Sequence, residues 1–425
     1  MIEPVVYANQ TAEELFGRRE ETTESVEEKV REIIADVRKN GDAALRKYSA
    51  LFDGYRGTAF EVTEEEFSEA FAALKPSYIS VLNGAAANIE KFHSMQIRYG
   101  FETETDGKII GQKVTPIPRA GIYVPGGTAA YPSTVLMNAI PAKIAGVREI
   151  IMATPVKSDG KVRAEVLAAA RICGVDRVFK LGGAQAIAAL AYGTESVPKV
   201  DKITGPGRDF VAAAKKLVSG VACGIDMLAG PSEILVIADE GADPEFVAAD
   251  LLSQAEHDIL ATAILVTDSE NLARNVSRKL EERVGKLSRE SIARASLEKN
   301  CKIILTRDLE TAVRLSDEYA PEHLELCVEK PFGLLEKVGN AGSVFLGYFT
   351  PEATGDYYAG SNHTLPTSGT AKFSSPLSVD DFVKTTQYVY YRKEALEREA
   401  EAIEEFAESE GLTAHAESVK ARIRR

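Results

Sequence analysis

The pair Glu322–His323, in the stretch "APEHLEL", sets a carboxylate beside one of only five histidines among 425 residues. Histidine titrates near neutral pH, so His323 could remove a proton from a hydroxyl group while Glu322 orients or activates a water molecule. The alternative is a surface turn that begins at Pro321. Successive side chains of a strand point to opposite faces, so the two residues can share a site only if the pair precedes regular strand geometry.

Gln254 and His257 are candidates for binding a metal ion. They lie three residues apart in "DLLSQAEHD", and hence on one face of a helix predicted to begin at Pro244. A histidine that merely sits at the negative end of the helix dipole is the plainer explanation. Neither HExxH nor a paired CxxC occurs, so a metal site would have to be assembled from distant segments. Asp356 in a long loop and His415 near the C-terminus carry suitable ligand atoms.

The remaining histidines and the cysteines carry weaker signals. His363, in "GSNHTLPT", has polar neighbours, whereas His93, in "NIEKFHSM", is expected to be an ordinary residue on a helix surface. The four cysteines lie in apolar contexts and are expected to be small buried thiols without disulfides, namely Cys173, Cys223, Cys301 and Cys327.

Four glycine-rich turns follow apolar runs, and their sequences are "YVPGGT", "LGGAQA", "TGPGRDF" and "AGPSE". Backbone N–H groups at such turns can bind anions such as a pyrophosphate when a helix follows. The usual GxGxxG motif is absent, and tight turns in any α/β protein look alike. Nucleotide binding is therefore an open alternative on these residues alone.

The elements that must position these residues alternate between strands and helices. The first hundred or so residues read as helical, with a capping box at Thr63 and Glu66 and an N-cap at Asp243 further on. From about residue 119, short apolar runs alternate with Ala-rich or charged helical segments, which predicts βαβ units and two parallel-sheet domains. Residues 349–377 have no periodicity, and a strand-like "FVKTTQYVYY" and an acidic helix follow them.

Composition excludes several classes of protein. Lys and Arg number 50 and Asp and Glu 64, so the net charge of −14 disfavours nucleic acid as a partner. No run approaches the 18 or so apolar residues of a membrane span. The sequence is typical of a cytoplasmic enzyme or binding protein with no membrane partner.

Taken together and in order, the motifs resemble those of the histidinol dehydrogenase family, whose members are zinc- and NAD-dependent. The resemblance covers essentially the whole chain and rests on these segments: "NGDAALRKYSALFDG", "AGIYVPGGTAAYPSTVLMNAIPAKIAGV", "KLGGAQAIAALAYGTESVPKVDKITGPG", "DMLAGPSEILVIAD", "DLLSQAEHD", "APEHLEL", "GDYYAGSNHTLPTSGTAKFSS" and "EGLTAHAESVKAR". Each segment alone is modest, but eight in sequence at this spacing are specific.

The resemblance implies a role for each matching residue. Zinc would be bound by Gln254, His257, Asp356 and His415, the last of them contributed by the other subunit of an intertwined homodimer. Glu322 and His323 fall on the catalytic pair. The substrate L-histidinol would contact Ser232, Gln254, His257, His323, Asp356, Glu410 and His415, and NAD would contact Tyr123, Gln185 and Arg208.

Arg208 departs from the family, which usually has Asn after "GPG". Because Arg is always charged and binds phosphate in a bidentate manner, this change could alter the grip on the cofactor or admit the 2′-phosphate of NADP.

The resemblance further implies two incomplete Rossmann-like domains and the final steps of histidine biosynthesis. The expected domains are an N-terminal segment (1–22), a discontinuous catalytic domain (23–122 with 232–377), an inserted NAD-binding domain (123–231) and a C-terminal tail (378–425) that reaches the partner subunit. Two alternatives remain: a related dehydrogenase of another small alcohol, such as a sulfonated diol, and a zinc hydrolase or nucleotide-binding regulator without redox chemistry.

Overall fold

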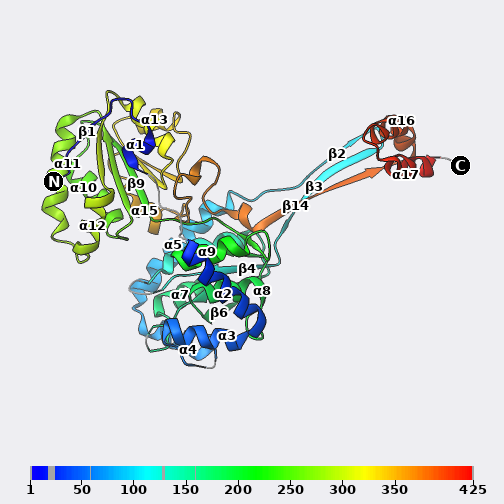
Figure 1. Cartoon of the computed structure of the whole chain (residues 1–425), viewed down its shortest axis with the longest axis horizontal. Helices are drawn as coiled ribbons and strands as arrows, with labels where there is room; N and C mark the ends of the chain where they lie inside the picture. The colour runs from blue at the N-terminus through cyan, green and yellow to red at the C-terminus, as the bar shows by residue number, and fades with distance from the viewer. Residues whose placement is uncertain (1, 18–23, 58, 127–129, 158, 424–425) are drawn as a thin grey trace. The chain divides into compact units, whose positions relative to one another are not determined.

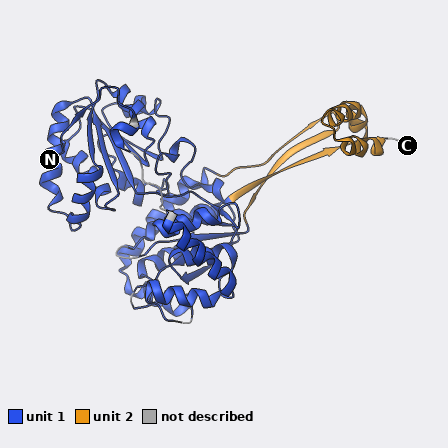
Figure 2. Cartoon of the chain, in the orientation of Figure 1, with its two compact units in different colours: residues 1–96, 118–382 blue, residues 97–117, 383–425 orange. Residues whose placement is uncertain are grey.

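A computed structural model of the chain describes residues 2–17, 24–57, 59–126, 130–157 and 159–423. The expected boundary between residues 22 and 23 lies outside these residues, as does part of the first glycine-rich turn, at 127–129. The chain forms two compact units, residues 1–96 with 118–382 and residues 97–117 with 383–425 (Figure 2).

The first unit contains two all-parallel sheets, as the alternation of strands and helices predicted. The first sheet, of which Figure 1 labels β4 and β6, has the strand order β6-β5-β4-β7-β8. Its strands are β4 (Arg119–Tyr123), β5 (Glu149–Thr154), β6 (Arg177–Lys180), β7 (Lys202–Thr204) and β8 (Gly224–Ile225). The helices between them are α6 (Pro132–Ile144), α7 (Ala164–Cys173), α8 (Gly183–Tyr192) and α9 (Asp209–Val218). Helix α8 is Ala-rich and almost wholly buried, because small side chains let it pack closely on the sheet and on neighbouring helices.

The N-terminal helices pack on the helices that flank this first sheet. They are α2 (Glu24–Asn40), α3 (Asp42–Tyr48), the π-helical turn η1 (Ser49–Asp53), α4 (Glu64–Ala73) and α5 (Pro76–Ser94). The predicted capping box of Thr63 and Glu66 at the start of α4 is confirmed. Apolar residues of α2 and α3 share one core with α8 and α9, so the expected grouping of 23–122 with 232–377 does not describe this core.

The second sheet has the order β1-β11-β10-β9-β12-β13 and carries most of the candidate site residues. Its strands are β1 (Val5–Val6), β9 (Glu233–Ala238), β10 (Thr262–Thr267), β11 (Lys302–Leu305), β12 (His323–Cys327) and β13 (Ser343–Leu346). One face is covered by α10 (Pro244–Ala255), α11 (Glu270–Val284) and α12 (Glu290–Asn300), and the other by α1 (Ala12–Phe16), α13 (Leu309–Tyr319) and α14 (Pro331–Leu335). Asp243 caps α10 as predicted, by accepting from the N–H of Glu245.

The segment without periodicity contains one helix that the sequence did not reveal, α15 (Glu352–Tyr357). Two short 3₁₀ turns follow, η2 (Thr370–Lys372) and η3 (Val379–Phe382). All four cysteines are buried and free, as expected. Among the described helices, none combines the length and apolar character needed to span a lipid bilayer.

The second unit consists of an antiparallel sheet and a helical hairpin. Its strands are β2 (Phe101–Thr105), β3 (Lys108–Pro116) and β14 (Val383–Tyr391), in the order β14-β3-β2. Its helices are α16 (Lys393–Ser409) and α17 (Thr413–Ile423), which pack on each other.

Candidate active site

The candidate catalytic residues lie at the amino edge of the second sheet. β12 begins at His323, opposite Ile234 of β9, and Glu322 immediately precedes the strand. Helix α10 runs back from the carboxyl edge after β9, and this brings Gln254 in its last turn to the same amino edge. Most α/β proteins bind ligands at the carboxyl edge, so this arrangement is unusual.

The chain makes a tight turn to present Glu322 and His323. The C-cap residue of helix α13 is Ala320, which adopts the left-handed conformation (φ 54°) that is costly for a residue with a side chain. Both residues of the pair are buried, with 8 % and 4 % of their surfaces exposed, so the alternative of a surface turn is wrong. Gly342 makes the close packing possible, because a Cβ there would lie 2.4 Å from the carbonyl oxygen of Glu322.

The imidazole of His323 is hydrogen-bonded at one nitrogen and open at the other. Nδ1 lies 2.9 Å from the carbonyl oxygen of Glu233, so we assign the proton to this nitrogen. Nε2 is buried and, among the residues that the structure describes, has no hydrogen-bond partner. The carboxylate oxygen Oδ1 of Asp356 lies 3.7 Å from it. Nε2 is therefore the atom that can exchange a proton with a bound molecule.

The charges around the pair shift both pKa values. Burial disfavours the imidazolium of His323, but the carboxylates of Glu352, Glu322 and Asp356 outweigh burial and raise its pKa well above the usual value. Burial raises the pKa of Glu322 to about 8, although His323 opposes this shift. Oε2 of Glu322 accepts from the N–H of Glu233 at 2.9 Å, which fixes the carboxyl group.

A cluster of possible metal ligands adjoins His323. Ligand atoms of His323, Glu352 and Asp356 all lie within 4.8 Å of one another. Our sequence reasoning selected His323 and Asp356 but missed Glu352. The available signal was the four-residue spacing of Glu352 and Asp356 in "PEATGDY", which puts both carboxylates on one face of α15.

Gln254 is fully buried beside Glu352. When the side-chain amide of Gln254 is oriented with its nitrogen toward Glu352, that nitrogen donates to the two carboxylate oxygens at 2.9 and 3.0 Å. The amide oxygen then accepts from the N–H of Glu233 at 3.0 Å. Ligation of a metal through that oxygen would require the amide to rotate. Burial raises the pKa of Glu352 to about 7, so a protonated Glu352 can donate to the rotated amide.

His257 and Asp356 complete the set of possible ligands in the first unit. His257 lies at the rim just after α10 and is exposed, yet the protein around the ring lowers its pKa by desolvation. Burial would raise the pKa of Asp356, but interactions with His323, His363 and His257 lower it overall, so this carboxylate is charged. A neutral imidazole, a carboxylate and an amide oxygen are a donor set that zinc accepts, and these residues fit such an ion.

His363 also faces this region. The residue is partly exposed, but its Nε2 is buried and without a hydrogen-bond partner among the described residues. Desolvation lowers its pKa while Asp356 opposes the shift. Two buried imidazole nitrogens, on His323 and His363, are therefore open to a ligand around one carboxylate. The sequence placed His363 in a polar context and, by the family resemblance, among the substrate-contacting positions, but gave it no catalytic or metal-binding role.

His93 corrects an expectation. We expected a helix-surface residue, but the structure buries it completely. It extends the apolar face of α5 formed by Leu82, Ala85 and Ile89, and its ring lies 2.7 Å from Gln96 Oε1 and 3.3 Å from Asn362 Nδ2. Hydrogen bonds thus allow His93 to be buried on the apolar face of the helix. Because histidine is a polar residue type, the sequence pattern did not reveal this burial.

The other candidate substrate residues lie in both units. Ser232 immediately precedes β9, and its carbonyl oxygen accepts from the N–H of Thr262 at 3.0 Å. Glu410 is the C-cap of α16 and His415 lies in α17; both are exposed, in the second unit.

Two of the three candidate NAD residues meet at the carboxyl edge of the first sheet. Tyr123 ends β4, and its hydroxyl accepts from the N–H of Gly183 at the start of α8. Gln185, in the first turn of α8, is 1 % exposed, and neither of its polar atoms has a hydrogen-bond partner among the described residues. Arg208 is the N-cap residue of α9; its side chain is exposed and lies 3.5 Å from Asp258.

A buried ion pair fixes the glycine-rich turn after β7. Lys215 and Asp226 are 2.5 Å apart with almost no exposure. Lys215 donates to the carbonyl oxygen of Gly205, and Asp226 accepts from the N–H of the same residue, both at 2.8 Å. Gly205 has φ +109°, and a Cβ there would lie 2.1 Å from the carbonyl oxygen of Tyr123. The pair therefore holds the turn against Tyr123.

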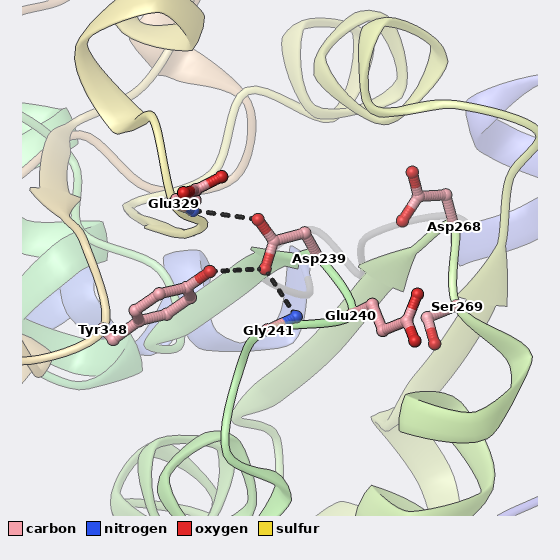
Figure 3. Close-up of a pocket in the computed structure, with 7 residues that line it drawn as sticks. All are labelled: Asp239, Glu240, Gly241, Asp268, Ser269, Glu329 and Tyr348. Atoms are coloured by element: carbon pink, nitrogen blue, oxygen red, sulfur yellow. Dashed lines mark hydrogen bonds between the residues drawn. The ribbon is translucent and has the colours of Figure 1, made fainter.

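The carboxyl edge of the second sheet holds an acidic pocket of about 640 Å³ (Figure 3). It is lined by Asp239, Glu240, Gly241, Asp268, Ser269, Glu329 and Tyr348. Asp239 accepts from Tyr348 Oη and from the N–H groups of Glu329 and Gly241, so it ties the strand ends together. The negative charge of four carboxyl groups disfavours binding of a pyrophosphate in this pocket. The candidate NAD residues Tyr123 and Gln185 lie instead at the carboxyl edge of the first sheet.

Comparisons with known proteins agree on one family. A sequence model described as histidinol dehydrogenase matches residues 16–423. The histidinol dehydrogenase of Geobacter sulfurreducens is 52% identical over 414 residues (96% of each chain), and that of Lactococcus lactis is 50% identical over 415 residues (97% of this chain and 96% of the relative). The crystal structure of histidinol dehydrogenase from Elizabethkingia anophelis superposes with a TM-score of 0.95 at 39% identity and covers 100% of this chain and 98% of that chain. The chain is thus a dehydrogenase, and it belongs to the histidinol dehydrogenase family.

Proposed function

We propose that the chain oxidises L-histidinol to L-histidine through L-histidinal, with zinc and two molecules of NAD, in the last steps of histidine biosynthesis. The observation that carries the proposal is the open Nε2 of His323, buried beside Asp356 with Nδ1 anchored to the Glu233 carbonyl oxygen. Such a nitrogen is a proton acceptor in fixed orientation. Membership in the family supports the identity of the substrate.

The residues that would hold zinc are Gln254, His257 and Asp356 with His415 of the partner subunit. When bound, zinc supplies an anchor for the imidazole and amino groups of the substrate, and NAD supplies the hydride acceptor. The protein then contributes positioning: buried side chains from α10, α15 and β12 keep the substrate's alcohol carbon in one orientation.

His323 and Glu322 divide the proton chemistry. A cation bound among the carboxylates that raise the His323 pKa would favour the neutral ring, and in that form Nε2 takes the hydroxyl proton during the first oxidation. The Nδ1–H···O bond to Glu233 keeps the ring in the required tautomer. Above its raised pKa of about 8 Glu322 is a carboxylate, and in that form it removes a proton from the water that hydrates the aldehyde before the second oxidation. Retention of the reactive aldehyde between the steps explains why one site performs both.

Features of the second unit support a homodimer. Seven consecutive residues of β14 and all of β2 are exposed, including Phe101, Val389 and Tyr390 at 63 %, 65 % and 55 %. A three-stranded sheet needs an apolar face covered to be stable. We infer that a second copy of the chain covers it and that His415 and Glu410 thereby reach the partner's site.

Separate assays of the two half-reactions test this division of labour. His323→Ala should impair oxidation of both histidinol and histidinal, whereas Glu322→Gln should mainly impair that of histidinal, which needs the water. NADH formation, followed by its near-ultraviolet absorbance, should reach two per histidinol in the wild type. Equal losses in both half-reactions of Glu322→Gln would contradict the assignment.

Subunit mixing tests the shared site. His415→Ala should lose bound zinc as well as activity, and mixing it with His323→Ala should restore activity because one site of each hybrid dimer is intact. If demonstrated exchange of subunits restores nothing, or if His415→Ala keeps its zinc, the shared site is refuted.

A further inference from the structure

Asp53 lies beside the start of α8 although it comes from the N-terminal helices. It is the last residue of η1, where Gly54 ends the turn in the left-handed conformation. A Cβ on Gly182 would lie 3.2 and 3.5 Å from the two carboxylate oxygens of Asp53, and 2.8 Å from Cβ of Pro155. The carboxylate therefore sits over the turn between β6 and α8, next to the residue that follows β5.

The surroundings of Asp53 contain polar groups that have no hydrogen-bond partner among the residues the structure describes. Gln185, in the first turn of α8, is buried with neither polar atom bonded to a described residue, and its Oε1 lies on the side of Gly183. Tyr123, whose hydroxyl accepts from the Gly183 N–H, is close enough for the charge of Asp53 to raise its pKa, although burial is the larger cause. A bound ligand could supply hydrogen-bond partners to the side-chain amide of Gln185.

Asp53 does not serve as a cap for α8. Among the described residues, no N–H or side chain donates a hydrogen bond to its carboxylate, and burial is what raises its pKa to about 6. A capping carboxylate would instead accept from backbone N–H groups, which lower the pKa. A half-buried carboxylate without donors is costly, and hydroxyl donors from a bound molecule would offset that cost.

The strand order of the first sheet indicates which hydrogen-bond donors the bound molecule would present to Asp53. β4 is the first strand of the sheet, and β5 and β6 follow on one side of it, as in dinucleotide-binding folds. In those folds an acidic residue after the second strand binds the ribose hydroxyls. Here β5 is followed by Pro155, Val156 and Lys157, none of which is acidic. Asp53 brings a carboxylate to that edge from another part of the chain.

We propose that Asp53 accepts hydrogen bonds from the ribose hydroxyls of the dinucleotide and excludes a 2′-phosphate, so that the site selects NAD over NADP. The inference rests on the proposed function, because it takes the carboxyl edge of the first sheet as the NAD site. A carboxylate accepts from vicinal hydroxyls, whereas a phosphate monoester carries nearly two negative charges and no such donors.

Calorimetric titration of NAD and NADP into the full-length protein at about pH 8 tests the proposal without relying on turnover. The wild type should bind NAD more tightly than NADP, and Asp53→Asn should reduce the ratio of the two affinities by roughly 10- to 100-fold. Asp159→Asn, which removes an exposed charge from the loop after β5, is the matched control and should keep the wild-type ratio.

A second measurement uses the wild type only and does not depend on how a variant folds. An NAD analogue that lacks the adenosine 2′-hydroxyl should bind about 10-fold more weakly than NAD. Equal affinities for NAD and the analogue, or an unchanged ratio in Asp53→Asn, would overturn the role of Asp53 while leaving the proposed dehydrogenase intact. Failure of the wild type to bind NAD at all would refute the proposed function itself and this inference with it.

Discussion

Replacement of Lys215 by Met should destabilise the first sheet far more than an ordinary loss of a salt bridge. Asp226 and Lys215 are 0 % and 2 % exposed, so the substitution leaves a buried carboxylate without its cation and the Gly205 carbonyl oxygen without its donor. Breaking a buried pair by removing one partner costs about 3–5 kcal/mol. The neighbouring Lys216, paired at the surface with Glu27, is the matched control, and Lys216→Met should cost less than about 1 kcal/mol.

Native-state hydrogen exchange is the suitable assay, because a chain with several lobes is not expected to unfold in one transition. A cost of 3–5 kcal/mol corresponds to a loss of protection of roughly 200- to 5,000-fold in peptides that cover β7 and α9. Adding Asp226→Asn to Lys215→Met removes the unpaired charge but keeps an acceptor for the Gly205 N–H. The double variant should recover to within about 1–2 kcal/mol of the wild type.

Two results would refute this reasoning. One is a loss of protection in Lys215→Met no larger than in Lys216→Met, which would mean that the buried pair stabilises no more than a surface pair. The other is a double variant as unstable as the single one, because the cost would then not arise from the orphaned carboxylate. In either case the ion pair would not be what holds the turn at Gly205.

Three further predictions follow from other contacts. Glu325, within β12, and Asp250 have pKa values raised chiefly by burial, that of Asp250 to about 6, so the folded state retains protons that the unfolded state releases. The free energy of unfolding should therefore fall as pH rises from the carboxyl pKa values of the unfolded chain, near 4, through the raised pKa values of the folded state. Glu325→Gln should flatten this pH dependence in thermal melts, and an unchanged pH dependence would contradict the prediction. Gly342→Ala places a Cβ against the Glu322 carbonyl oxygen and should cost about 1–3 kcal/mol and lower kcat, with a wild-type melt and rate as the contrary result. Arg208→Asn should weaken binding of NAD and NADP alike, since Arg208 follows β7 and not β5; a calorimetric change in their ratio would instead favour a 2′-phosphate contact.

Local signals in the sequence predicted the elements of this fold. Apolar runs predicted the parallel strands of both sheets except the two-residue strands β1 and β8, and the N-caps at Thr63 and Asp243 marked true helix starts. These signals suffice because helix and strand periodicity and capping depend on neighbours within a few residues. The ordered motifs identified the family in the same way, and the comparisons confirm it.

The residues next to Glu322 and His323 in the sequence could not predict that the pair is buried or which side chains surround it. Three elements meet at the pair: β12 starts at His323, α10 returns to the amino edge of the sheet with Gln254, and α15 carries Glu352 and Asp356. The only local sign of Glu352 is its four-residue spacing from Asp356, because its other partner, Gln254, lies about 100 positions away along the chain.

The sequence alone thus determined the elements, the family and most of the candidate chemistry. Only the tertiary structure decided that His93 is core, that the N-terminal helices pack on the helices that flank the first sheet, and that Asp53 reaches the start of α8. The physical reason is the same in each case. Burial and ionisation depend on which distant surfaces meet, and the pattern of one segment carries no record of the surface that covers it.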